Sequence, residues 1–164
     1  MAYTIRRPAA ADAPALAGLH VATWQQTYEH LLPEGFFTEE HRRKRQGMWE
    51  HILGQEREDF EVRLAEQDGE PLGFAFSGPS VPTAKSVPPR ERQLFCLYVL
   101  QSGHGTGVGQ DLFNGVLGEE AAMLWVEPGN PRAISFYRRN GFEFDGTEQT
   151  DPGTPRIVEA RMLR

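Results

Sequence analysis

The sequence predicts an α/β fold with a mixed sheet. Two observations support this prediction: one central unit of the chain, and the order of the patterns on either side of it. An unbroken apolar run at residues 94–100 predicts a strand buried on both faces. Glycines then occupy every second position from Gly103 to Gly109, and apolar residues recur at helical spacing over residues 108–117. The central unit is therefore expected to be a buried strand, a glycine-rich turn and a helix.

The N-terminal part of the chain predicts a short strand and two helices. Residues 3–6 alternate between apolar and polar, as in a strand, and the next helix is expected to begin with Asp12 as its cap. A second helix is expected over roughly residues 38–53, capped by Thr38. The basic run at residues 41–45 of this helix is interpreted as a solvated face without a function.

The patterns on either side of the central unit complete a sheet within one domain, residues 1–164. Two alternating segments around Asp68-Gly69 predict a β-hairpin, and the prolines of residues 78–90 predict a long irregular loop. The remaining elements are expected to be a buried strand at 122–126, a helix at 130–140 and two closing strands at 142–149 and 156–163.

Composition limits the possible functions and locations. Hydrophobic content of 39% and charged content of 24% suit a soluble globular protein. A net charge of −6 argues against non-specific nucleic-acid binding, which needs a basic surface, and no apolar run approaches membrane-spanning length. The single cysteine, Cys96, excludes a disulfide within the chain and is expected to be a buried packing residue. We therefore expect a cytoplasmic protein with no nucleic-acid or membrane partner.

The glycine-rich turn predicts an anion site. Its backbone N–H groups are expected to converge on one position that no side chain blocks. The helix that follows adds the positive end of its dipole there, so phosphate is the anion that suits this turn best. A dinucleotide fingerprint is excluded because Val108 or Gln110 occupies the place of its third glycine. A Walker A loop is excluded because the only lysines, Lys44 and Lys85, are distant. Four glycines between a buried strand and a helix disfavour the alternative, a flexible turn without a ligand.

Two blocks of the sequence resemble the motifs of the GNAT superfamily of N-acetyltransferases. The first is Leu97-Tyr98-Val99 followed by His104-Gly105-Thr106-Gly107-Val108-Gly109, which is similar to the Arg/Gln-x-x-Gly-x-Gly/Ala signature for acetyl-CoA. The second, from Asn130 to Phe142, is similar to the family's Asn-x-x-Ala-x-x-Phe-Tyr-x-x-x-Gly-Phe segment, spacing included. His104 departs from the family's usual arginine or glutamine.

The resemblance implies a mixed, mostly antiparallel sheet with helices on both faces. The parallel strands at 94–100 and 122–126 are expected to splay apart and admit the cofactor. The implied reaction transfers an acetyl group from acetyl-CoA to an amine of a small molecule or peptide, by direct attack of the amine on the thioester and without a metal. The residues implied for acetyl-CoA binding are Leu97, Tyr98, Val99, His104, Gly105, Thr106, Gly107, Val108, Gly109, Asn130 and Tyr137.

The resemblance also assigns Tyr137 as the catalytic acid, because its phenol can protonate the leaving thiolate. A core aromatic beside Phe136 is the alternative for Tyr137, and a helix cap is the alternative for Asn130. No general base is assigned. Glu91 and Glu127 flank the two strands, but each also fits an ordinary surface carboxylate, and a water chain can take the proton instead.

The resemblance implies that the acceptor side lies largely on the first two helices and nearby loops, here residues 21–37. Trp24 and Tyr28 are four residues apart and so share one helix face. They are expected to bind the substrate, as a wall or as a cation–π surface for an ammonium group, and core packing is an equally favoured alternative. A CoA-sensing module without turnover is the other class of function left open. The resemblance also allows a homodimer.

Overall fold

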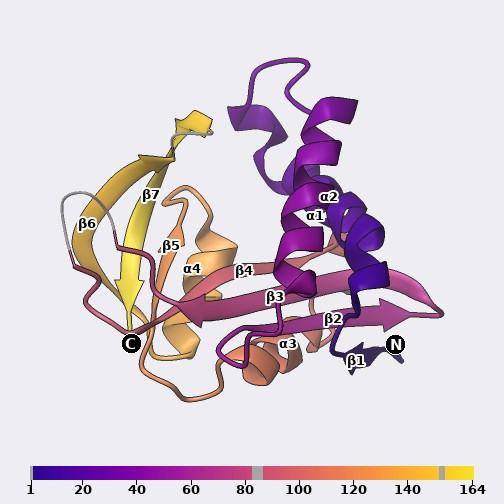
Figure 1. Cartoon of the computed structure of the whole chain (residues 1–164). Helices are drawn as coiled ribbons and strands as arrows, with labels where there is room; N and C mark the ends of the chain where they lie inside the picture. The colour runs from indigo at the N-terminus through magenta and orange to yellow at the C-terminus, as the bar shows by residue number, and fades with distance from the viewer. Residues whose placement is uncertain (1, 83–86, 152–153) are drawn as a thin grey trace. The chain divides into compact units, whose positions relative to one another are not determined.

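The computed structural model describes residues 2–82, 87–151 and 154–164 (Figure 1). Its strands and helices are β1 (Thr4–Arg6), α1 (Ala13–Tyr28), α2 (Glu39–Gly54), β2 (Glu61–Gln67), β3 (Glu70–Pro79), β4 (Arg92–Val99), α3 (Val108–Val116), β5 (Met123–Val126), α4 (Pro131–Arg139), β6 (Glu143–Asp151) and β7 (Thr154–Leu163). The predicted order of elements is confirmed. Residues 83–86 of the predicted loop lie outside the described residues.

The strands form a seven-stranded mixed sheet in the order β1-β2-β3-β4-β5-β7-β6. β4 and β5 run parallel. The pairs β1–β2, β2–β3, β5–β7 and β6–β7 are antiparallel. The predicted mixed, mostly antiparallel sheet is therefore confirmed.

The chain divides into two compact units, Met1–Ser77 with Cys96–Gly118 and Gly78–Phe95 with Glu119–Arg164. β4 contributes residues to both. Within the first unit, α1 and α2 lie on one face of β2 and β3, and α3 lies on the opposite face (Figure 1). This unit accordingly has helices on both faces of its strands.

β4 differs from the prediction in its exposure. Gln93 and Leu94 are buried, but residues 95–99 are only half-buried. The expectation of a strand buried on both faces is therefore wrong beyond Leu94. The reason is that, among the described residues, the pairing of β4 with β5 joins only Gln93 to Met123 and Leu94 to Leu124. The short pairing agrees with the expected splay, because the strand continues past its last hydrogen-bonded partner on that side.

Cys96 lies in this half-buried part of β4. The residue as a whole is more exposed than expected. Its thiol is nevertheless buried, and this burial raises the pKa of the thiol to about 12. The thiol is therefore protonated at neutral pH, which agrees with a packing role rather than a nucleophilic one.

Local interactions explain where the first two helices begin. Thr38 caps α2 as predicted, since its side-chain oxygen accepts a hydrogen bond from the His41 N–H at 3.1 Å. Asp12 does not cap α1. Its carboxylate accepts from the Ala9 N–H at 2.7 Å and from the Arg6 guanidinium at 2.8 and 2.9 Å. A 3-10 turn at Ala10–Asp12 precedes α1 and directs this side chain back along the chain.

The cores of the units consist of large apolar side chains, as the periodicity predicts. In the first unit, Trp49, Phe74 and Phe113 are at most 1% exposed, and in the second Phe142 and Met162 are fully buried. Among the described residues, the helices are too short or too polar to cross a membrane.

Candidate functional site

The glycine-rich turn joins β4 to α3, and two of its glycines have backbone conformations that other residues rarely adopt. Gly105 has φ +78° and Gly107, the residue before α3, has φ +92°. A Cβ built on Gly105 meets no atom within 4 Å, and one on Gly107 meets only the Tyr3 hydroxyl, at 3.5 Å. The outer surface of the turn is therefore open to a ligand.

Thr106 and Gly103 hold the turn in place. The Thr106 hydroxyl donates to the Gly103 carbonyl at 2.7 Å and accepts from the Val108 N–H at 3.4 Å. Gly103 itself is buried, and a Cβ there would lie 2.8 Å from Val99 Cγ1 and 3.1 Å from Leu72. This glycine is thus required for close packing and not for contact with an anion.

The remaining glycines of the turn supply donors. In the part of the chain that the structure describes, the N–H groups of Gly105, Gly107 and Gly109 have no protein acceptor. They precede or begin α3, a helix of nine residues with its positive dipole end at the turn. Unused N–H donors at an open helix N-terminus fit a pyrophosphate group.

His104 binds the main chain of β4. Its Nε2 lies 3.0 Å from the Val99 carbonyl oxygen, which can only accept, so this nitrogen is the donor. The side chain is exposed, whereas Leu97, Tyr98 and Val99 are half-buried along β4. The contact ties the beginning of the turn to the end of β4.

The sequence patterns did not identify Tyr3 and Asp111 as neighbours of the turn. The Tyr3 hydroxyl donates to Asp111 Oδ2 at 2.6 Å. Asp111 lies in the first turn of α3, so the bond holds the start of the chain next to Gly107. Only long-range packing could reveal this pair, because the two residues are 108 positions apart.

The second unit carries Asn130 and Tyr137. The Asn130 side chain accepts from the Ala133 N–H at 3.2 Å and caps α4, which is the alternative considered for it. Tyr137 is 9% exposed, with ring centroids 5.6 Å from Phe136 and 6.0 Å from Phe142. Tyr137 therefore packs as a core aromatic, and the acid role of its hydroxyl remains a prediction.

The two carboxylates considered as bases occupy ordinary positions. Glu127 is half-buried, and its Oε1 accepts from the Gly129 N–H at 2.8 Å in the turn that follows β5. Glu91 is exposed just before β4. Neither geometry favours one carboxylate as the base.

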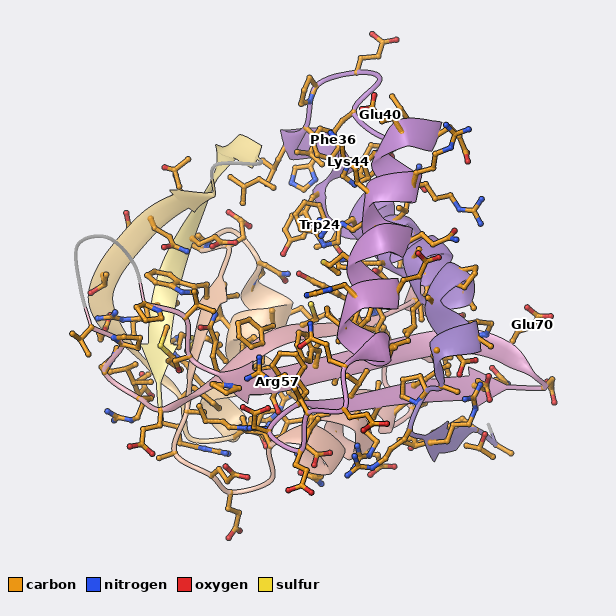
Figure 2. The ribbon with its side chains drawn as sticks, viewed as in Figure 1. Trp24, Phe36, Glu40, Lys44, Arg57 and Glu70 are labelled. Carbon is orange, nitrogen blue, oxygen red and sulfur yellow. The ribbon has the colours of Figure 1, made fainter. Side chains whose placement is uncertain are left out.

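Trp24 and Tyr28 do come together, within an aromatic cluster of the first unit. Figure 2 labels Trp24 beside the helices α1 and α2. The Trp24 ring centroid is 4.9 Å from that of Tyr28 and 6.5 Å from that of Tyr98 on β4. His20 belongs to the same cluster and is 3% exposed. Its Nδ1 accepts a hydrogen bond from Trp49 Nε1 at 3.3 Å. Trp24 is 8% exposed, so packing accounts for most of its surface.

The basic run on α2 contains one residue whose position the sequence patterns missed. Arg43 and Lys44 are exposed and pair with glutamates four residues earlier, at 4.0 and 3.6 Å, as expected for a solvated face. Arg45 is half-buried, and its guanidinium carbon lies 5.3 Å from the centroid of the Trp24 ring. Helical spacing is the signal that could have identified it, since Arg45 is four residues before the fully buried Trp49.

His20 makes the stability of the protein depend on pH. Burial lowers its pKa well below 6.5, and the charge of Arg45 lowers it further. The unfolded chain takes up a proton at His20 as pH falls through about 6.5, while the folded chain does not. We therefore expect the free energy of unfolding to decrease below this pH, by at most about 1.4 kcal/mol per pH unit from this group.

Urea unfolding of the wild type and His20→Gln at pH 7 and pH 5 measures this effect. Glutamine does not titrate, and its amide oxygen can accept from Trp49. The variant is expected to lose less stability than the wild type between the two pH values. Equal losses would show that His20 is not the group responsible.

In the described part of the chain, no group of three or more His, Cys, Asp or Glu side chains is arranged to hold a metal ion.

Comparison with known proteins connects this arrangement to a family. The model of the "Acetyltransferase (GNAT) family" matches residues 24–142. A probable N-acetyltransferase of Mycobacterium tuberculosis is 26% identical over 145 residues, which are 87% of this chain and 80% of that protein.

Solved structures show the same fold. The PaiA N-acetyltransferase of Thermoplasma acidophilum, solved in complex with coenzyme A, superposes with a TM-score of 0.74 at 20% identity, over 100% of this chain and 99% of the other. A ribosomal-protein-alanine N-acetyltransferase of Brucella melitensis superposes with a TM-score of 0.69 at 24% identity, over 98% of each chain.

Proposed function

Because the chain belongs to the acetyltransferase (GNAT) family, we propose that it transfers an acetyl group from acetyl-CoA to an amine of a small molecule or peptide. The observation that carries the proposal is the turn before α3. There, Gly105, Gly107 and Gly109 offer N–H donors without protein acceptors at an open helix N-terminus. These donors suit the pyrophosphate of acetyl-CoA.

The proposal assigns the other binding residues as follows. The main chain of Leu97, Tyr98 and Val99 on half-buried β4 holds the pantetheine arm and polarises the thioester carbonyl. The His104 side chain supports this strand through the Val99 carbonyl rather than replacing the family's arginine directly. Asn130, besides capping α4, contacts the amides of the cofactor.

The reaction proceeds by direct attack. The amine arrives mostly as an ammonium, since its ordinary pKa is about 10, and loses a proton to water before it reacts. Its nitrogen lone pair then attacks the thioester carbon, and a backbone N–H of β4 stabilises the oxyanion. Collapse of this intermediate breaks the carbon–sulfur bond, and the Tyr137 hydroxyl protonates the departing thiolate. The positively charged substrate nitrogen loses its extra proton to water, and the Tyr137 phenolate regains a proton from water. The products are an amide and CoA.

Two measurements test the proposal against the alternative of a CoA sensor. Calorimetric titration with acetyl-CoA is expected to show binding, and release of free thiol from acetyl-CoA is expected to rise when an amine is added. A sensor would bind acetyl-CoA but release no thiol above background. Absence of acetyl-CoA binding would contradict both readings.

The proposal covers residues 1–164 as one N-acetyltransferase domain, supported by a family match that includes residues of both compact units. It also includes a cytoplasmic location, supported by a single cysteine, and allows a homodimer.

A further inference from the structure

Arg45 on α2 is the basic residue that the proposed function does not use. It is half-buried, and among the described residues it has no carboxylate partner. The hydrogen bond seen for it runs from Nη1 to the sulfur of Met48 at 3.7 Å, and a thioether is a weak acceptor. A guanidinium has five N–H donors, so most of its capacity for hydrogen bonding is available to a ligand.

Trp24 lies beneath this guanidinium and also has a donor without a partner. Its indole Nε1 is buried and has no hydrogen-bond partner in the part of the chain that the structure describes. Trp24 is only 8% exposed, and buried donors nearly always have an acceptor. The Arg45 guanidinium lies over this indole ring, 5.3 Å from its centroid. Two donors that lack strong acceptors therefore share one cluster.

The surroundings of Arg45 favour an anion. The charge of Arg45 reaches His20 and His41, since the pKa of each is lowered first by burial and then by Arg45. The thiol of Cys96 also lies within reach of its charge, and it is protonated at neutral pH. Among the described residues, no carboxylate forms an ion pair with the Arg45 guanidinium.

The cluster also lies against the strand that the proposed function assigns to acetyl-CoA. The Trp24 and Tyr98 ring centroids are 6.5 Å apart. Nearby, the Gln101 N–H donates to Gln26 Oε1 at 2.9 Å, which joins α1 to the end of β4. A group bound between Trp24 and Arg45 would thus be close to β4.

We propose that Arg45, held over the Trp24 ring, binds a carboxylate of the acceptor, so that the substrate is an amine that also carries a carboxylate group. This inference rests on the proposed function. It replaces the cation–π surface expected for an ammonium at Trp24, because the Arg45 guanidinium already lies over that ring and repels a second cation. The aromatic ring of Tyr28 then lines the apolar side of the same subsite.

Paired substrates test this inference in the presence of acetyl-CoA. Each pair consists of an amino acid and its amide, such as glycine with glycinamide and phenylalanine with phenylalaninamide, and the measured quantity is the ratio of their kcat/KM values. We expect Arg45→Gln to lower the acid-to-amide ratio about tenfold or more, since charge-assisted hydrogen bonds are the strong ones. The kcat/KM for the acid is expected to fall much more than that for the amide, and Arg45→Lys is expected to give an intermediate ratio.

Arg43→Gln is the matched control, because it removes the same charge from an exposed position on the same helix. It is expected to leave the ratio unchanged. Equal ratios in the wild type, Arg45→Gln and Arg43→Gln would overturn the inference while leaving the acetyltransferase function intact. A tenfold loss of acetyl-CoA affinity in Arg45→Gln, with an unchanged ratio, would assign the guanidinium to a cofactor phosphate and would also overturn it.

A binding experiment decides the question without turnover. The Trp24 indole N–H gives a ¹H–¹⁵N resonance that Trp24→Phe identifies. Titration of the wild type with 4-aminobutanoate is expected to shift this resonance. Two titrations are expected to leave it unchanged: the wild type with 4-aminobutanamide, and the Arg45→Gln variant with 4-aminobutanoate. Identical behaviour towards acid and amide would overturn the inference. A shift without any acetyl-CoA binding would retain the carboxylate subsite and reject the proposed function.

Discussion

Replacing Gly107 with glutamate is expected to abolish acetyl-CoA binding, with a loss of affinity of about 100-fold or more, because opposed like charges cost several kcal/mol. Gly107 precedes α3, and a Cβ there points into open space beside the Tyr3 hydroxyl. The added carboxylate would occupy the region in which the N–H groups of the turn are expected to hold the pyrophosphate. Calorimetric titration with acetyl-CoA measures the loss.

Two further variants separate charge from backbone strain. Gly107→Ala has the same unfavourable φ of +92° but adds only a methyl group with ordinary contacts, and it is expected to retain most of the affinity. Gly69→Glu places the same side chain at φ +80° in the hairpin between β2 and β3, again in open space. It is expected to bind acetyl-CoA like the wild type. Equal affinities for Gly107→Glu and Gly107→Ala would show that the phosphate is not bound at this turn.

Tyr137→Phe is expected to lower kcat about 100- to 1000-fold while KM for acetyl-CoA changes little, since a general acid typically contributes at least this factor. The ring of Tyr137 packs against Phe136 and Phe142, and phenylalanine preserves these contacts. The fold and the affinity for CoA are therefore expected to be retained. Steady-state kinetics with a fixed amine measures the effect.

The outcome distinguishes the two roles considered for Tyr137. A core aromatic without a chemical role would give a kcat within a few fold of the wild type after removal of the hydroxyl. Tyr137→Leu, which removes ring packing as well, is the comparison for stability: it is expected to lower the unfolding temperature, whereas Tyr137→Phe is not. A normal kcat in Tyr137→Phe would require another donor for the thiolate.

The predictions from local patterns agree best with the structure. The two-residue period identified the β2–β3 hairpin and its turn, where Asp68 and Gly69 both have positive φ. The glycine-rich turn and α3 follow β4 as predicted, because glycines at positive φ and apolar residues at helical spacing act over a few residues. The cap at Thr38 is equally local.

The errors occur where a distant segment decides the environment. The apolar run of β4 was expected to be fully buried, but its pairing with β5 ends after Leu94, and a run of apolar residues does not reveal where its partner strand stops. The basic run of α2 was interpreted as a uniform solvated face. One of its members, Arg45, lies over Trp24 of another helix.

The sequence by itself determined the order of the elements, the glycine-rich turn that begins α3 and, through two motif blocks, the family. Each of these depends on neighbours within one element or one turn. Only the tertiary structure decided which distant side chains lie together: Tyr3 with Asp111 beside Gly107, and the Arg45 guanidinium over the Trp24 ring. The physical reason is that such contacts arise when separate helices and strands pack against one another. The spacing of residues along one element does not determine which residues of another element they will contact.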